Sequence, residues 1–314
     1  MEKRVRLSER HYPVLVTGAR GLLGRALGPL ILRAAPVRQR GSGRPAAEAV
    51  RLTDLEDLDV TDAAAVARAV RDLRPRTVFH LAAWTDVDGA ESHPAEARRL
   101  NVEAAEHVAR AAAEAGALVV HMSTDFIFDG AKPGPYVEED PPGPLSVYAR
   151  TKAESESRVR AAAPRHLIVR TAWLYGGGRR DFIAAVLDRA RRGEPLRVVT
   201  DQVGCPTWSE DLARALAALV ESGACGTFHA CGQGEASRYD EAVEALAAAG
   251  LPARVEPVLT ADVPRAARRP ARAVLSAEKL IAAAGFRFPP WRESVRRYVA
   301  MLAAGVKTPA TPGT

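Results

Sequence analysis

Cysteine is scarce in this chain. Its 314 residues include only three, Cys205, Cys225 and Cys231. Three thiols are too few for a disulfide framework, and their spacing does not match a zinc site. The sequence therefore argues against a disulfide-rich secreted domain and assigns no metal site. We expect all three cysteines to be small buried hydrophobic residues.

Long apolar segments are also missing. No stretch approaches the roughly 18 consecutive apolar residues of a membrane helix. The start of the chain, Met1–Arg6, is charged and has no apolar segment of the signal-peptide kind behind it. These absences predict a cytoplasmic protein without a membrane partner.

A third absence is a basic stripe interleaved with aromatic residues. The 44 lysines and arginines outnumber the 38 acidic residues and give a net charge of +6. The basic residues are nearly all arginines, scattered through an alanine-rich sequence with acidic residues nearby, which is typical of solvated helix faces. We therefore predict no nucleic-acid partner.

The chain does have short apolar runs that alternate with alanine-rich helical segments. Its length, with 47% hydrophobic residues, is enough to bury a large core in one big or two coupled domains. The apolar runs are typical of strands buried on both faces of a parallel sheet. They lie at residues 13–17, 49–53, 77–83, 117–125 and 167–171. The pattern predicts an α/β fold with a Rossmann-type, doubly wound parallel sheet.

The alternation becomes irregular in the second half of the chain. We expect residues 13–172 to form a dinucleotide-binding domain and residues 173–304 a smaller C-terminal substrate-binding lobe over the carboxyl edge of the sheet. A strand near 226–230 is expected to rejoin the sheet. Residues 1–12 and 305–314 are predicted to be flexible termini.

Three glycines follow the first predicted strand. Gly18, Gly21 and Gly24 stand between that strand and an apolar helical segment. Glycine allows a tight turn, close approach of the backbone to a pyrophosphate and close packing of helix on strand. The free N–H groups of the helix start favour an anion. The stretch predicts nucleotide binding.

The second strand ends at Asp54, where the sequence leaves the choice of cofactor open. An acid at this point favours NADH by binding a ribose 2′-hydroxyl, whereas Arg40, Arg44 or Arg51 would meet the 2′-phosphate of NADPH. Further along, Asp59 stands where an adenine edge can be contacted.

The candidate chemistry lies on one strand end and one helix. The strand 117–125 ends on Ser123, Thr124 and Asp125, where a substrate carbonyl could be held. Tyr148 and Lys152 are spaced i,i+4 and therefore share a helical face. We expect the lysine charge to favour the ionised phenol, lowering the pKa of Tyr148 and making it a proton donor.

These motifs occur in the order and spacing of the extended short-chain dehydrogenases/reductases, and the resemblance covers about residues 13–302. Within that superfamily the chain resembles the dTDP-4-dehydrorhamnose reductase family. Segments 201–208 and 267–270 separate this family from epimerases and dehydratases of the same fold. The resemblance is carried by these two segments together with 82–91, 123–130 and 170–175.

The resemblance implies an oxidoreductase of dTDP-rhamnose biosynthesis, in which NADPH or NADH reduces the C4 ketone of dTDP-4-dehydrorhamnose to dTDP-L-rhamnose. Tyr148 would donate the proton, Thr124 would hold the carbonyl oxygen, and Lys152 would assist and bind the nicotinamide ribose. The implied cofactor contacts, besides Tyr148 and Lys152, are Gly18, Ala19, Arg20, Gly21, Leu22, Gly24, Asp59, Val60, Ala82, Ala83 and Thr85. The implied substrate contacts are Asp125, Val203, Trp208 and Arg269.

For a few of these residues the sequence allows two roles. Trp208 suits packing within the lobe as well as a substrate contact, and Asn101 suits either an ordinary helix position or a structural role near the site. Of Arg268 and Arg269, we expect one in a salt bridge and one on a phosphate.

The sequence also departs from the family pattern. His80 stands where the family usually has Asn, Phe126 where it often has Tyr, and Arg272 where it has Asn. The last change touches the substrate end, so a 4-ketoreductase of another dTDP-deoxysugar stays an alternative. A second alternative is a non-catalytic NADP-binding protein similar to the regulatory subunit of methionine adenosyltransferase. Some relatives dimerise through Mg²⁺ held by carboxylates; no such site can be assigned here, and a homodimer stays open.

Overall fold

The computed structural model describes residues 6–36, 49–177 and 181–305. Arg40, Arg44 and most of the expected flexible C-terminus lie outside these residues, as do residues 1–5. Residues 6–12 correct the expectation of a flexible N-terminus. Leu7 and Tyr12 are both 2% exposed, and the Tyr12 hydroxyl donates a 2.7 Å hydrogen bond to the carbonyl of Ile31. This segment is tied to the core by apolar burial.

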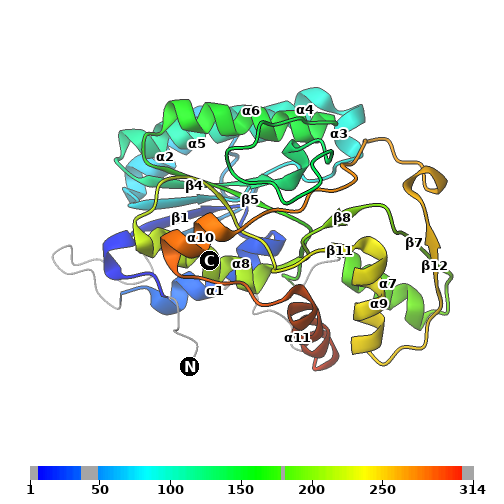
Figure 1. Cartoon of the computed structure of the whole chain (residues 1–314). Helices are drawn as coiled ribbons and strands as arrows, with labels where there is room; N and C mark the ends of the chain where they lie inside the picture. The colour runs from blue at the N-terminus through cyan, green and yellow to red at the C-terminus, as the bar shows by residue number, and fades with distance from the viewer. Residues whose placement is uncertain (1–5, 37–48, 178–180, 306–314) are drawn as a thin grey trace.

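The centre of the fold is a six-stranded sheet in the order β10-β5-β4-β3-β1-β2, with every pairing parallel (Figure 1). Of its inner strands, β1 and β3 are buried along their whole length and β4 and β5 over most of theirs, as their apolar runs predict. The expected α/β fold with a parallel sheet is confirmed. The strands are β1 (Val14–Thr17), β2 (Val50–Thr53), β3 (Thr77–His80), β4 (Leu118–Thr124), β5 (His166–Thr171) and β10 (Gly226–His229).

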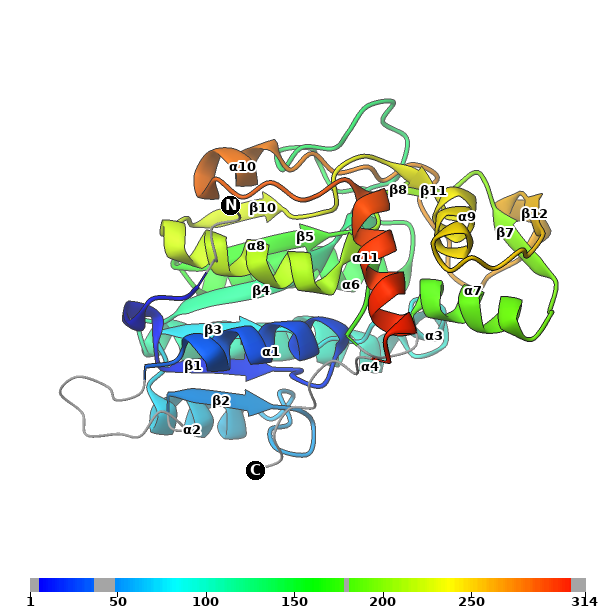
Figure 2. The ribbon, with the colours of Figure 1, turned by 90° about the horizontal axis from the view of Figure 1, so that it is seen from below.

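Helices cover both faces of the sheet (Figures 1 and 2). Val14 and Val16 of β1 face one apolar cluster, with α1 and α8, while Leu15 faces the other, with α2, α5 and α6. Alternate residues of a strand point to opposite faces, so one apolar strand serves both layers. The helices are α1 (Leu22–Ala34), α2 (Ala63–Leu73), α5 (Ala104–Glu114), α6 (Val147–Ala162) and α8 (Ser209–Ser222).

The long helical segment that carries Asn101 contains an irregular turn. It consists of α4 (Pro94–Arg98), a π-helical turn at Arg99–Glu103, and α5. The short helix α3 (Gly89–Ser92) precedes it. The π turn carries Asn101, which is 1% exposed. Such turns are frequent at functional sites because they redirect one side chain of a helix.

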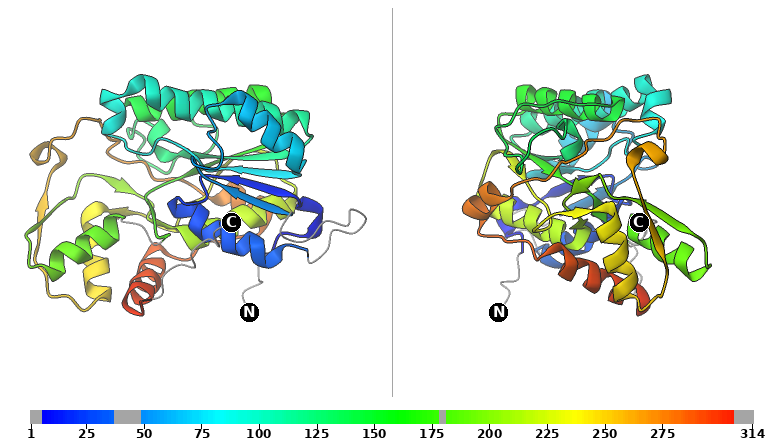
Figure 3. Two further views of the ribbon diagram at one scale, coloured as in Figure 1. Left: turned by 180° about the vertical axis from the view of Figure 1, so that it is seen from behind. Right: turned by 45° about the vertical axis from the view of Figure 1, so that its right-hand side comes forward.

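A smaller lobe lies beyond the carboxyl ends of the strands (Figures 1 and 3). Its apolar cluster is separate from those of the sheet and includes Tyr175, Trp208 and Tyr298. The elements of the lobe are α7 (Phe182–Arg191), α9 (Arg238–Ala248), α11 (Trp291–Ala303) and the paired strands β7 (Leu196–Val199) with β12 (Val255–Val258), β6 (Leu174–Tyr175) with β9 (Thr207–Trp208), and β8 (Val203–Gly204) with β11 (Ala236–Ser237).

Three elements within residues 173–304 belong with the sheet rather than the lobe. Strand β10 pairs with β5, α8 packs against α1, and α10 (Glu278–Ala284) contributes Leu280 to the same apolar cluster. The chain therefore passes between the two parts more than once. Within the described residues, none of the helices is long and apolar enough to cross a bilayer.

Candidate active site

The glycine turn connects β1 to α1 at the carboxyl edge of the sheet. Gly18 has a φ of +68°, and a Cβ there would lie 2.6 Å from the backbone nitrogen of Ala82. The turn thus rests directly on the chain leaving β3. Helix α1 begins after Gly21, and no side chain caps its first N–H groups. These groups have the chemistry to bind a pyrophosphate.

The rim next to this turn is charged. The backbone N–H of Arg20 donates to Asp54 at 2.9 Å, and its guanidinium pairs with Glu56 at 2.5 Å. Asp59 accepts from both the backbone and the hydroxyl of Thr61, and these hydrogen bonds lower its pKa. Asp54 is thus already engaged in fixing the turn that the cofactor is expected to meet.

Asn101 fixes the loop that leaves β3. Its side-chain oxygen accepts from the backbone N–H of Trp84 at 2.8 Å, and its amide donates to Thr151 at 2.9 Å. Asn101 therefore ties the loop with Ala82, Ala83 and Thr85 to helix α6. This is the structural role near the site.

Thr124 and Tyr148 come together at the end of β4. Ser146 caps helix α6 by accepting from the N–H of Ala149, which places Tyr148 in the first turn. The Thr124 hydroxyl lies near enough to the Tyr148 hydroxyl to influence its pKa. Thr124 also donates to Asp125 at 2.9 Å. The arrangement holds two hydroxyl groups ready for one oxygen atom.

The pKa of Tyr148 differs from the expectation. Burial raises it to about 12, the Thr124 hydroxyl acts against this rise, and the charge of Asp125 adds to it. The charge of Lys152 does not contribute to the shift, which differs from the effect that the sequence predicted. The phenol therefore carries its proton at neutral pH, as a proton donor must.

Lys152 lies one turn further along α6 and is 3% exposed. Burial lowers its pKa to about 8, while the charge of Glu156 raises it. Two neutral histidines lie in the strands beneath: the rings of His80 and His121 stack at 5.5 Å. Burial lowers the pKa of His80 to about 3. His80 is thus a buried strand residue.

Asp125 is buried and only half satisfied. Burial raises its pKa to about 7, opposed by the hydrogen bond from Thr124 and by the charge of Arg238. Its second oxygen has no partner within the described part of the chain. A substrate hydroxyl would meet that need.

Trp208 belongs to the core of the lobe. It is 6% exposed, its ring lies 6.4 Å from that of Tyr298, and the guanidinium of Arg297 stacks on it at 5.0 Å. Of the two roles that the sequence allowed for Trp208, these contacts agree with packing within the lobe. Val203 is half-buried in β8, where its backbone bonds with Ala271 and Ala273.

Arg269 forms a two-pronged salt bridge with Asp88. Its two terminal nitrogens donate to the two carboxylate oxygens at 3.1 and 2.8 Å. The contact joins the lobe to the loop that leaves β3 and holds the pKa of Asp88 below its usual range. Arg268 is exposed.

The sequence analysis missed Arg238, the first residue of α9. Its guanidinium stacks on the ring of Trp173 at 3.7 Å and donates to Glu241 at 2.8 Å. Its charge reaches Asp125. Nothing in the local sequence marks this arginine, because its place near the site depends on the packing of α9 against the chain after β5.

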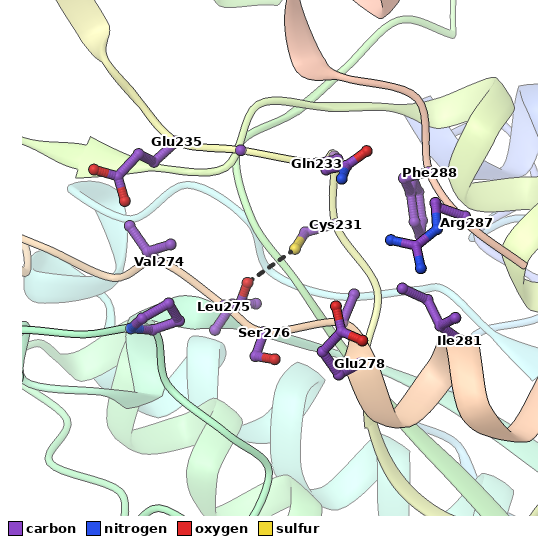
Figure 4. A pocket seen from close by; sticks show the side chains of 14 residues that line it. Cys231, Gln233, Glu235, Val274, Leu275, Ser276, Glu278, Ile281, Arg287 and Phe288 are labelled. Atoms are coloured by element: carbon purple, nitrogen blue, oxygen red, sulfur yellow. Dashed lines mark hydrogen bonds between the residues drawn. The ribbon is translucent and has the colours of Figure 1, made fainter.

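A separate hollow of about 260 Å³ lies between the chain after β10 and α10 (Figure 4). Its lining includes Cys231 and Arg287 but none of the predicted site residues. Cys231 and Cys205 are buried as expected, and both thiols face the carbonyl of Leu275. Cys225 is exposed, which corrects the expectation for that residue.

Comparison with known proteins places this geometry in a family. The model described as the RmlD substrate binding domain matches residues 12–304. The chain belongs to this family. It is 38% identical over 308 residues to a dTDP-4-dehydrorhamnose reductase of Sinorhizobium fredii, covering 92% of this chain and 98% of that protein.

Two further proteins to which the chain is similar carry names that mention a cofactor or a substrate. The structure of a dTDP-4-dehydrorhamnose reductase from Bacillus anthracis in complex with NADP aligns with a TM-score of 0.85 at 31% identity, covering 94% of this chain and 99% of that one. A probable dTDP-4,6-dihydroxy-2-methyloxan-3-one 4-ketoreductase of Streptomyces antibioticus is 37% identical, covering 95% of this chain and 98% of that protein. The family resemblance and the oxidoreductase fold are thereby confirmed.

No group of three or more His, Cys, Asp or Glu side chains arranged to hold a metal occurs among the described residues. The comparisons support a nicotinamide cofactor for these relatives and say nothing of magnesium.

Proposed function

We propose that the protein reduces the C4 ketone of dTDP-4-dehydrorhamnose to dTDP-L-rhamnose with NADPH or NADH. The observation that carries this proposal is the meeting of the Thr124 and Tyr148 hydroxyls at the end of β4, with buried Lys152 one turn along the helix that carries Tyr148. The family, whose named members include dTDP-4-dehydrorhamnose reductases, supplies the substrate class.

The residues present suit a dinucleotide. The uncapped start of α1 offers N–H groups to a pyrophosphate, and the absence of a side chain at Gly18 lets the turn rest against Ala82. A bound nicotinamide would supply the hydride. We propose that Gly18, Ala19, Arg20, Gly21, Leu22 and Gly24 hold the pyrophosphate, that Asp59 and Val60 lie by the adenine, and that Ala82, Ala83, Thr85, Tyr148 and Lys152 line the ribose and nicotinamide.

The proton chemistry follows from the hydroxyl pair. As negative charge develops on the substrate oxygen, the Tyr148 hydroxyl donates its proton to that atom and Thr124 donates a hydrogen bond to it. The phenolate left on Tyr148 is stabilised by the positive charge of Lys152. The high pKa of free Tyr148 keeps the proton in place until the oxygen gains charge.

The lobe would bind the remainder of the substrate. We propose that Asp125 and Val203 face the sugar, and that Arg238 faces the diphosphate because its stacked guanidinium is held rigidly. The surroundings of Trp208 support lobe packing rather than substrate contact. Arg269 reaches a phosphate only if it leaves Asp88.

The deciding experiment is incubation with dTDP-4-dehydro-L-rhamnose and either NADPH or NADH, following the absorbance of the reduced cofactor. Oxidation dependent on the sugar supports the proposal, and no oxidation with either cofactor contradicts it. Product analysis then fixes the configuration at C4.

A 4-ketoreductase acting on another dTDP-deoxysugar is the second candidate. Arg272, which replaces the usual Asn at the substrate end, pairs with Glu235 at 2.5 Å and donates to the carbonyl of Pro133 at 3.1 Å. The relative from Streptomyces antibioticus carries a name of this kind. Faster turnover of a different dTDP-4-keto sugar in the same assay would favour it.

A further inference from the structure

Lys152 presents an electrostatic problem that the proposed reaction leaves unsolved. A buried ammonium group loses its hydration, which favours the neutral amine. Lys152 is 3% exposed, and no salt bridge joins it to another side chain within the described residues. Another group must therefore stabilise the Lys152 ammonium, whose positive charge the Tyr148 phenolate needs in the proposed reaction.

Glu156 is placed to do this. It lies four residues after Lys152 in α6, so the two side chains share one face of the helix, and it is 2% exposed. Its carboxylate accepts hydrogen bonds from Ser123 at 2.5 Å and from two nitrogens of Arg170 at 2.9 and 2.8 Å. The guanidinium of Arg160, which is largely exposed, lies 3.6 Å from the same carboxylate. Two strands, β4 and β5, thus fix a buried carboxylate one helical turn from the lysine.

We propose that Glu156 is a positioning residue that keeps Lys152 cationic inside the protein, and that Ser123 and Arg170 hold it there. This inference rests on the proposed function for its catalytic meaning. The contacts of Arg170 continue away from α6: it donates to the carbonyl of Glu138 at 3.1 Å and lies 3.4 Å from a ring nitrogen of His229. The guanidinium of Arg170 therefore contacts groups on both sides of β5.

The other ionisable groups around Lys152 do not supply the charge. His80 on β3 and His121 on β4 are held neutral by burial, which lowers the pKa of each. Tyr148 on α6 keeps its proton. Asp125, after β4, is engaged with Thr124 and has its own pKa raised to about 7 by burial. The charge of Glu156 is the one that raises the pKa of Lys152.

The first test reads the lysine directly and needs no substrate. The chain has only five lysines, so protein labelled with ¹³C at the lysine ε-carbon gives a simple NMR spectrum, in which Lys152→Met assigns the buried signal. The five are Lys3, Lys132, Lys152, Lys279 and Lys307. We expect Glu156→Gln to lower the titration midpoint of Lys152 by about one to two pH units.

The matched control is Glu154→Gln. It makes the same charge change on the same helix, but Glu154 pairs with Arg98 at 2.7 Å on a partly exposed face. We expect the Lys152 midpoint to stay unchanged in this variant. An unchanged midpoint in Glu156→Gln, or an equal shift in both variants, overturns the proposal.

The second test reads turnover. The alkaline limb of the kcat–pH profile should move to lower pH in Glu156→Gln and return toward the wild-type position in Glu156→Asp. A purely structural role would lower kcat at every pH without moving the limb, and that result also overturns the proposal. If wild-type protein oxidises no cofactor with the sugar, the proposed function fails while the NMR titration still decides the role of Glu156.

Loss of the carboxylate leaves Arg170 buried without its partner, which threatens folding. Ser123→Ala retains the ion pair and removes one hydrogen bond to Glu156. If Glu156→Gln does not fold, the proposal requires a smaller downward shift of the Lys152 midpoint in Ser123→Ala, and no shift contradicts it.

Discussion

The carboxyl edge of the sheet and the smaller lobe present their functional side chains in different ways. At the sheet edge, Thr124 and Lys152 are buried and hydrogen-bonded or desolvated before any ligand arrives. In the lobe, Arg238 and Arg269 are partly exposed and rest on side chains from distant segments, Trp173 and Asp88. Burial thus shapes the groups at the sheet edge, whereas the lobe arginines are held by salt bridges and ring contacts at partly exposed positions.

The largest effect is expected at the sheet edge, from Tyr148→Phe. Removal of the proton donor should reduce kcat by about 10²- to 10⁴-fold while cofactor affinity stays unchanged. Turnover of the dTDP-4-keto sugar and fluorescence titration with NADPH measure the two quantities. Tyr136→Phe is the control, because Tyr136 donates to Asp129 at 2.7 Å, away from the hydroxyl pair. Full turnover in Tyr148→Phe would contradict the proton role.

Gly18→Ala tests how tightly the turn rests on β3. A side chain at φ +68° is strained, and its Cβ would lie 2.6 Å from backbone. We expect a loss of about 2–3 kcal/mol in the free energy of unfolding. Gly116→Ala, with φ +67° and no atom near its Cβ, isolates the strain and should cost about 1 kcal/mol. Equal losses in urea denaturation would show that the turn can move off Ala82.

Asp125→Asn tests the cost of burial at the sheet edge. Burial raises the pKa of Asp125 to about 7, above an unfolded value of about 3.9. The native state therefore binds this proton more tightly, and the stability that it contributes is complete below about pH 4 and is lost as pH rises through 7. Without this carboxyl, the variant should gain about 4 kcal/mol relative to wild type at pH 8 and little at pH 4.

The measurement is urea denaturation of both proteins at the two pH values. Glu241, a buried lobe residue whose pKa is also raised to about 7, is present in both proteins, so its own pH dependence cancels from the difference. The same difference at pH 4 and pH 8 would mean that Asp125 is ionised throughout this range.

The smallest effect is expected in the lobe, from Arg238→Met. Loss of the stacked guanidinium should raise KM for the dTDP sugar about tenfold, or about 1.4 kcal/mol, with little change in kcat. Arg296→Met is the control, since Arg296 pairs with Glu244 on the outer face of α11. Equal KM values for the two variants would remove Arg238 from the substrate site and weaken the contrast between lobe and sheet.

The sheet was predictable because its signals are local. Each buried strand appears as a short apolar run, and β1, β2, β4 and β5 lie within one residue of their expected positions. The glycine turn and the i,i+4 pair of Tyr148 and Lys152 also need only neighbouring residues. The packing of α8 (Ser209–Ser222) against α1 joins positions far apart in the chain, and no local pattern shows it.

The lobe and the buried charges were less predictable because their contacts join distant positions. Arg238 acquires its place from Trp173, and β12 pairs with β7 across the lobe. The motif around Trp208 allowed either a substrate contact or packing within the lobe. The folded chain places the ring in the lobe core.

The sequence by itself determined the parallel sheet, the position of the glycine turn and the helical face that Tyr148 shares with Lys152, because period, glycine placement and helical spacing act over a few residues. Tertiary structure alone decided the protonation states and partners of those groups. Burial raised the pKa of Tyr148 and lowered that of Lys152, and β4 and β5 brought Ser123 and Arg170 to Glu156. Desolvation and long-range pairing depend on which segments meet, and only the folded chain brings them together.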